Sequence, residues 1–451
     1  MRQMNFALAL LTAAVLTACG GTGSSGGDQT HAVKFDKQVS FGDSLSDVGT
    51  YKVGGIAAAG GGTFTINGDN TSINPELTGK NWTEVLAAEL RLPKPCPAQT
   101  GLNGQDNADP ALDYNVPVVN NANCFNYAQG GSRVSDPIGS HHRTNDPIVG
   151  QLTVPLTTQV ANHLAKSGGK FNGTELVTVM SGGNDVLMQL AGLSAGGTAA
   201  GTRAGQAAFG PLLISGVVAT VPAANRATAA TNVTTAVQNA AAAGATQQQI
   251  AGAAVQAAAL LGADVTAATA AATKAGTDAA AAGAKAGADY AAAEGPKLVA
   301  ALGAAGAELA NIVNTQILAK GAKYIVVNNL PDVASTPSGK SQAASTQQLI
   351  AAMVDAFNAQ LKANLKNDPA IAYVDLFSVS KDQVANPAIY GLTNTAQKAC
   401  TSPSSLTCTA KTLSAPDTSH FMFADDIHPT PYEYWLVTRY VLKDMAVKGW
   451  L

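Results

Sequence analysis

The chain has 451 residues, of which 46% are hydrophobic and 5% aromatic, and its formal net charge is -3. This length suits one large domain with an insertion, and the apolar fraction is sufficient for a sizeable core. The absence of a basic excess excludes a nucleic-acid-binding surface, which would need a stripe of Lys and Arg.

The first 18 residues are expected to form a signal peptide. Arg2 gives a short basic start, and residues 6–18 are apolar or small, a run too short for a stable membrane anchor. Residues 16–20, Leu-Thr-Ala-Cys-Gly, resemble a bacterial lipobox, in which the cysteine (here Cys19) is lipidated and becomes the first residue. The alternative is an ordinary signal peptide cut nearby. Residues 19–32 then form a flexible tether, and a glycine after the cysteine favours the outer membrane.

A serine follows the first predicted strand. Residues 33–41 are predicted to be a strand, and residues 41–47 read Phe-Gly-Asp-Ser-Leu-Ser-Asp. A serine at a strand end, between small and acidic neighbours, is where a nucleophile would be presented, so Ser44 is the candidate. A hydroxyl is a poor nucleophile at its ordinary pKa, and it needs a base, a group that orients the base, and an oxyanion hole.

The next stretch is predicted to alternate helices with strands. Hydrophobic residues at helical spacing predict an amphipathic helix over 82–90, and the Pro/Asn/Asp-rich residues 91–123 are predicted to be loop. Further on we expect a short strand over 124–128 with a turn at 129–132, a helix over 154–164, and a buried strand over 175–180 that ends at a turn over 181–185.

Residues 191–305 differ in composition from the rest of the chain. Alanine, glycine, threonine and glutamine dominate, and charges are sparse. Alanine has the best helix propensity, so helices are predicted over 247–261 and 264–293. We interpret this segment as a helical insertion. The alternative is a lid or a partner-docking hairpin near the active site.

After the insertion, the predicted helices and strands alternate again. The strands here are continuous apolar runs, which indicates a parallel sheet covered on both faces. The predicted elements are helices over 306–319, 346–365 and 432–447, strands over 323–331 and 371–377, and a loop over 421–430.

The cysteines fit an exported protein. With Cys19 lipidated, four of the five cysteines remain, an even number that suits an oxidising compartment. Three pairings are possible, and Cys96–Cys124 with Cys400–Cys408 is the most economical. No Cys/His spacing suggests zinc, and neither a metal nor a cofactor is expected.

Among the six histidines, His428 is the best candidate for the base. It lies in Asp-Asp-Ile-His-Pro-Thr at 425–430, where Asp425 can reach the imidazole Nδ1 while Nε2 faces the serine. His420 is the only rival. The others are expected in the tether, in an exposed polar loop or within a helix: His31, His141, His142 and His163.

Three hydrogen-bond donors are candidates for the oxyanion hole. These are the amide of Asn184, which follows a strand and a double glycine, and the backbone N–H groups of Gly131 and Ser44. Taken singly, the Gly-Gly and Asn-Asp pairs are common in turns, and each alone would indicate only a turn.

Four short motifs together resemble the ordered blocks of the GDSL, or SGNH, hydrolase family. They are Gly-Asp-Ser-Leu-Ser-Asp at 42–47, Asn-Tyr-Ala-x-Gly-Gly at 126–131, Gly-x-Asn-Asp at 182–185 and Asp-x-x-His-Pro at 425–429. The resemblance covers roughly residues 35–190 and 305–450. It implies a three-layer α/β/α sandwich with a mostly parallel sheet, spanning 33–451 and interrupted by the alanine-rich insertion. Thr50, where many relatives have asparagine, departs from the pattern outside the catalytic set.

The resemblance also implies roles for these residues. Ser44 would be the nucleophile, His428 the general base and acid, and Asp425 its orienting group. Ser44, Gly131 and Asn184 would form the oxyanion hole, with Gly130 as the alternative to Gly131. The implied activity is hydrolysis of carboxylic esters through an acyl-enzyme, with an ester or lipid as substrate. Phospholipase or lysophospholipase action, carbohydrate deacetylation, and a non-catalytic surface binding protein are the alternatives.

Overall fold

A four-stranded parallel sheet forms the centre of the molecule. The computed structural model describes residues 32–70 and 75–451, so the predicted signal peptide, Cys19 and His31 lie outside the described residues. The strands are arranged in the order β1-β4-β5-β6, and each neighbouring pair is parallel. Their bounds are Gln38–Gly42 for β1, Leu176–Met180 for β4, Tyr324–Asn328 for β5 and Ile371–Val374 for β6.

Helices cover both faces of this sheet because side chains alternate along each strand. Val177 and Val179 of β4 lie in one hydrophobic cluster, while Leu176 and Met180 of the same strand lie in another. The three layers confirm the predicted mixed α/β fold. The first cluster includes residues of α4 (Leu156–Lys166) and α10 (Ala344–Asn364), and the second includes residues of α3 (Trp82–Glu89) and α12 (Pro431–Val447).

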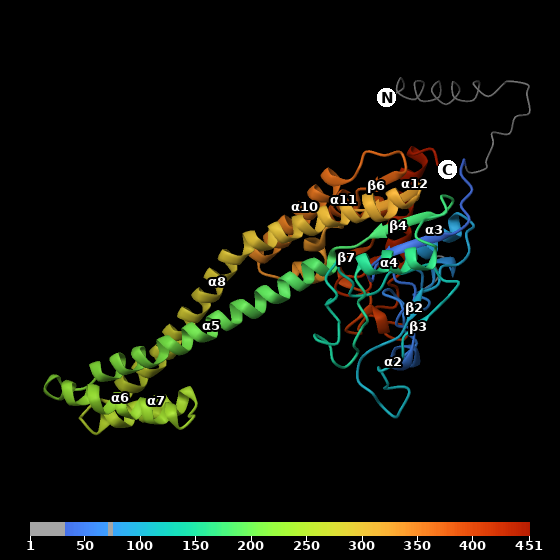
Figure 1. Ribbon diagram of the computed structural model, residues 1–451. Coiled ribbons are helices and arrows are strands. Elements are labelled where there is room, and N and C mark those ends of the chain that lie inside the picture. The colour runs from blue at the N-terminus through green and yellow to red at the C-terminus, as the bar shows by residue number, and fades with distance from the viewer. Residues whose placement is uncertain (1–31, 71–74) are drawn as a thin grey trace, which may run out of the picture.

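The alanine-rich residues 191–305, which we call the arm, project from this body as a pair of long helices (Figure 1). Gly201 and Gly283 bring the pair into close contact, because a Cβ at either glycine would lie within 2.8 Å of the other's carbonyl oxygen. The arm has its own hydrophobic cluster, which includes Phe209, Leu213 and Val233. Its helices are α5 (Gly183–Ala219), α6 (Arg226–Ala242), α7 (Gln247–Ala259) and α8 (Val265–Ile312).

The arm helices are continuous with the body. The predicted helices over 264–293 and 306–319 are one helix, α8, and the predicted turn over 181–185 is largely the first turn of α5. Gly295 and Pro296 look like a helix end in the sequence, but Gly295 is buried beside Leu349 of α10 and the helix continues. The compositional boundaries at 191 and 305 therefore lie inside helices.

The helix α8 is unusually apolar, and 39% of its most apolar stretch is buried in the fold. By length and composition, Val265–Lys320 is the one candidate membrane-spanning helix among the described residues, with a hydropathy of 1.3. A core helix of a folded protein meets the same criteria, and α8 packs against α5 in the arm and against α10 in the body.

The remaining elements are short and lie in the loops around the sheet. The predicted strand over 124–128 is reduced to isolated parallel bridges at Asn126, one to Ser40 of β1 and one to Pro97. Both predicted disulfides are present, Cys96–Cys124 and Cys400–Cys408, which indicates a protein outside the cytoplasm. The short elements are α2 (Gly54–Ala58), β2 (Gln99–Thr100), β3 (Val119–Asn120), α9 (Pro337–Lys340), α11 (Leu376–Ala385), β7 (Asn394–Lys398) and β8 (Phe421–Phe423).

Candidate active site

Ser44 lies in a tight turn at the carboxyl end of β1. The backbone N–H of Ser46 donates to the Asp43 carbonyl over 3.1 Å, and the N–H of Leu45 donates to the Asp43 carboxylate over 3.1 Å. These bonds hold the chain in a turn where it leaves the sheet. Ser44 is 8% exposed, so its hydroxyl is largely shielded from water.

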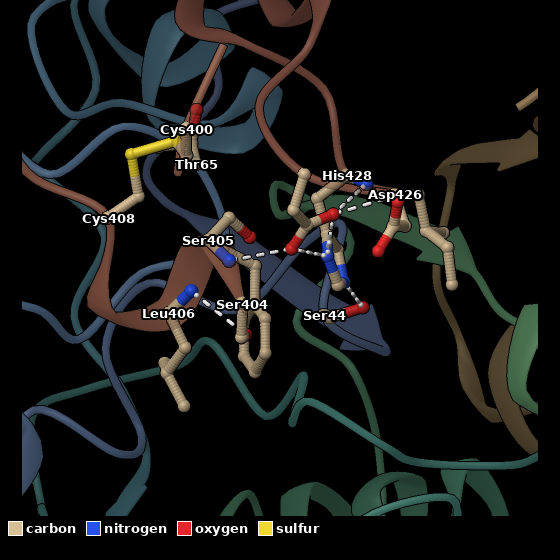
Figure 2. A network of polar contacts seen from close by, with 12 residues as sticks. Ser44, Thr65, Cys400, Ser404, Ser405, Leu406, Cys408, Asp426 and His428 are labelled. Atoms are coloured by element: carbon tan, nitrogen blue, oxygen red, sulfur yellow. Dashed lines mark hydrogen bonds and ion pairs between the residues drawn. A yellow bond between two sulfur atoms is a disulfide. The ribbon is translucent and has the colours of Figure 1, made fainter. Parts of the chain in front are cut away.

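The structure brings Ser44, His428 and Asp425 together, and Figure 2 shows the Ser44 side chain beside that of His428. The Ser44 Oγ lies 2.8 Å from the Nε2 atom of His428, and the His428 Nδ1 atom lies 2.8 Å from Asp425 Oδ2. Asp425 also accepts hydrogen bonds from the backbone N–H groups of Ile427, His428 and Ser405. The carboxylate is therefore fixed by its own loop and by the neighbouring turn.

The electrostatic environment shifts the pKa values of Asp425 and His428 in opposite directions. Burial raises the pKa of Asp425, but the charge of His428 and the hydrogen bonds from His428 and Ser405 outweigh it, so this pKa lies well below its ordinary range. Burial lowers the pKa of His428, but the charge and hydrogen bond of Asp425, together with the charge of Asp43, raise it above its ordinary 6.5. Asp425 thus stays ionised beside an imidazole that readily accepts a proton.

Asp43 is a second buried carboxyl at the site. It precedes Ser44, is 2% exposed, and burial raises its pKa to about 7. A hydrogen bond from Leu45 and the charge of His428 act in the opposite direction.

Among the described residues, two backbone N–H groups near the serine have no hydrogen-bond acceptor. Within the described part of the chain, the N–H groups of Ser44 and Gly131 have no acceptor, whereas the N–H of Gly130 donates to Asp47 over 2.9 Å. Gly131 has a φ of +80°, and a Cβ there would lie 2.6 Å from the Thr153 side chain, so only glycine fits. The geometry therefore favours Gly131 over Gly130 as an anion-binding donor.

The Asn184 side chain is anchored at both ends of its amide. Its Oδ1 accepts a hydrogen bond from the Ser140 hydroxyl over 2.6 Å, and its Nδ2 donates to the Ser132 carbonyl over 3.0 Å. An NH2 group has two hydrogens, so one remains for another acceptor. Ser44, Gly131, Asn184 and His428 all line one cavity of about 120 Å³ whose walls are mostly apolar.

Several residues that hold this site together were not predicted from the sequence. Asp47 accepts from three backbone N–H groups, including that of Gly130. Gln159 of α4 bonds both the N–H and the carbonyl of Gly42. An ion pair of 3.0 Å between Arg133 and Asp185 ties the loop after Gly131 to the first turn of α5. Asp47 and Asp185 lie within the recognised motifs, but Gln159 and Ser140 give no local signal in the sequence.

The other histidines in the described residues lie in different surroundings. The His420 ring packs on Tyr432 and does not line the cavity, so the structure does not bring it to Ser44. His163 is fully buried against Phe171, and burial lowers its pKa to about 4. His141 lines the cavity from an exposed loop and pairs with Asp146. No group of three or more His, Cys, Asp or Glu residues in 32–70 and 75–451 is arranged to hold a metal ion.

Comparison with known families agrees with this arrangement. The profile of the GDSL-like lipase/acylhydrolase family matches residues 193–441, more than half of the chain. The chain belongs to this family. The matched range contains Asp425, His428 and the arm from residue 193 onward, whereas Ser44, Gly131 and Asn184 precede it. No curated protein matches the chain significantly.

Proposed function

We propose that this protein hydrolyses carboxylic esters through an acyl-enzyme formed on Ser44. Membership of the GDSL-like lipase/acylhydrolase family implies an ester hydrolase. The observation that carries the finer proposal is the hydrogen-bonded series from Ser44 Oγ through His428 to Asp425, with 2.8 Å at each step. This is the arrangement that activates a serine hydroxyl for attack on an acyl carbon.

In the first half of the reaction, Ser44 Oγ attacks the ester carbonyl carbon while His428 Nε2 takes the hydroxyl proton. The imidazolium that forms is stabilised by the ionised Asp425, and it then gives the proton to the departing alcohol oxygen. Water enters, loses a proton to His428 and attacks the acyl-enzyme. The carboxylic acid leaves and Ser44 regains its proton.

Negative charge on the carbonyl oxygen is expected to be stabilised by the Ser44 and Gly131 N–H groups and the Asn184 amide. All three belong to the rim or wall of the same cavity, and the two N–H groups have no competing acceptor among the described residues. Such donors act best when they are already positioned before the reaction.

A fluorophosphonate probe tests the proposal directly. It should label the wild type and not Ser44→Ala, and absence of labelling in the folded wild type would refute a serine mechanism. With a short p-nitrophenyl ester, His428→Ala should be inactive while His420→Ala stays active. Loss of activity only in His420→Ala would overturn the assignment of the base.

We further propose that the protein is exported and attached to the cell envelope through lipid on Cys19. The lipobox-like residues 16–20 and the disulfides support this placement. Growth with an alkyne analogue of palmitate should label the wild type but not Cys19→Ser, and only the variant should be released from the membrane fraction. An unlabelled wild type would contradict the anchor.

A further inference from the structure

A large groove runs from the active-site cavity along the arm. It has a volume of about 940 Å³ and lies between one face of α5 and one face of α8, with loops of the body at its base. A helix rises about 1.5 Å per residue, so the lining of α5 from Leu187 to Gln206 is roughly 28 Å long. Figure 1 shows the two helices leading away from the body along this course.

The groove adjoins the cavity that contains Ser44. Four residues line both spaces: Leu187, Val333, Thr336 and Ile427. Leu187 lies one turn beyond Asn184 on α5, and Ile427 immediately precedes His428. A long substrate whose ester is at Ser44 would therefore have the arm groove directly beside its binding cavity.

The lining of the groove suits a hydrocarbon. None of the described residues that line it carries a charge, whereas α8 has exposed ion pairs on other faces, such as Lys274–Asp278 and Lys285–Asp289. Near the site its wall includes the apolar side chains of Leu190, Val333 and Ile350, and the polar residues of the lining are all uncharged Ser, Thr and Gln. The backbone groups of α5 and α8 are used within the helices, so they offer a peptide no strand-like backbone pairing here.

Small residues keep the groove deep. Glycine and alanine form most of the α8 lining, including Gly276, Ala280 and Ala284. A Cβ at Gly276 would meet no atom within 4 Å, so packing does not demand glycine there and its effect is to leave space.

We propose that this groove binds the hydrocarbon chain of a long-chain lipid ester while its carbonyl lies at Ser44. The inference rests on the proposed ester hydrolysis and adds a chain-binding subsite built from the arm. The active-site cavity, at about 120 Å³, takes a short group, and a longer chain continues onto α5 and α8. Each buried methylene contributes about 0.8 kcal/mol, so the groove confers a preference for long chains.

Two matched variants test the subsite. Ala284 is exposed and lines the groove, whereas Ala281, exposed on the same helix, does not line it. Ala284→Trp should lower the ratio of kcat/KM for p-nitrophenyl hexadecanoate to that for the butyrate on the order of tenfold, the loss of contact with about two methylenes. Ala281→Trp, with the same cost in helix propensity, should keep the wild-type ratio, and thermal unfolding should show both variants folded.

A binding measurement separates this proposal from the activity. A fluorescent long-chain fatty acid should bind the Ser44→Ala protein, and adding Ala284→Trp should weaken binding about tenfold, while adding Ala281→Trp should not. Equal ratios and equal affinities in the two tryptophan variants would overturn the subsite while leaving ester hydrolysis intact. Self-association that only Ala284→Trp abolishes would assign the groove to a second copy instead. Fatty-acid binding without any ester hydrolysis would refute the proposed activity alone.

Discussion

At the scale of single residues, the Asn184 amide shows how a reactive geometry is prepared before substrate arrives. The Ser140 hydroxyl donates to its oxygen and its NH2 group donates to the Ser132 carbonyl, so the amide is held in one orientation in the wall of the cavity that Ser44 also lines. Asn184→Ala should lower kcat on the order of 100-fold or more, because one donor to the developing oxyanion is lost. Steady-state kinetics on a short p-nitrophenyl ester measures the effect.

Ser140 lines the cavity and donates a hydrogen bond to the Asn184 oxygen, so we expect it to act as a positioning residue for that amide. Ser140→Ala should cause a smaller loss, confined to kcat with KM unchanged, and Ser140→Thr should restore activity because it keeps the hydroxyl. A loss in Ser140→Ala that matches a fall in thermal stability, and that Ser140→Thr does not rescue, would assign the serine a merely structural part.

The protonation state of His428 should set the pH dependence of activity. His428 must be neutral to accept the proton, so kcat/KM should fall as the pH drops through its pKa, which lies above 6.5. Asp425→Asn removes the negative charge that raises this pKa. The acid limb should therefore move to lower pH, and kcat should fall by about 10³–10⁴, because the imidazole tautomer is no longer held.

Asp426 supplies the matched control for this profile. It is the neighbouring aspartate, it is half exposed, and it pairs with Lys398 over 3.4 Å. Asp426→Asn should keep the wild-type profile. An acid limb that stays in place in Asp425→Asn would mean that another group titrates.

At the scale of elements, the Cys400–Cys408 disulfide braces the loops that hold Asp425. The Cys400 N–H donates to the Ala424 carbonyl, and Cys408 ends the turn in which the Ser405 N–H donates to Asp425 (Figure 2). The double variant Cys400→Ser/Cys408→Ser should lose about 2–4 kcal/mol of stability, and kcat should fall as Asp425 loosens. Cys96→Ser/Cys124→Ser should lose comparable stability with a smaller change in kcat. A larger fall in kcat in Cys96→Ser/Cys124→Ser than in Cys400→Ser/Cys408→Ser would contradict this account.

The contact between α11 and α12 contains a buried acid. Glu433 is 4% exposed, and its carboxyl accepts one hydrogen bond, from the fully buried Gln383. Burial raises its pKa from 4.5 to about 8. Between these values the unfolded chain releases a proton that the folded protein keeps, so stability falls as the pH rises.

Glu433→Gln should remove the loss of folding stability that accompanies a rise in pH. The Tm of the variant should exceed that of the wild type by a margin that grows from pH 5 to pH 8, as measured by scanning calorimetry. A margin that is independent of pH would show that the carboxyl ionises equally in both states.

The elements that the sequence predicts well are those with a strong local pattern. β4 and β5 are continuous apolar runs, and α3 has hydrophobic residues at helical spacing, so their positions follow from sequence. Ser44 and His428 lie in short motifs at element ends, where local sequence also carries the signal. The bounds of the arm helices do not follow from sequence, because alanine-rich helices lack a distinct apolar face. The sequence therefore does not indicate where α5 begins or that α8 continues into the body. The contribution of Ser140 depends on a contact 44 positions away, which no local pattern can indicate.

At the scale of the whole molecule, the hydrophobic interior is divided. Two clusters lie on the faces of the sheet, and a third lies in the arm beyond the reach of the body. Seven of the thirteen buried residues in the arm cluster are alanines, which bury little apolar area each. The distal arm should therefore open more readily than the sheet, since local stability follows buried apolar contact.

Hydrogen exchange can test this division with two matched leucines. Leu213 of α5 is fully buried in the arm cluster, and Leu309 of α8 is fully buried against the body. Truncation of a buried leucine costs about 2–5 kcal/mol. Leu213→Ala should speed amide exchange in α6 and α7 while leaving β4 and the hydrolysis of a short ester unchanged. Leu309→Ala should speed exchange in β4. If Leu213→Ala accelerated β4 equally, arm and body would unfold as one unit, and the long helices would transmit stability along their whole length.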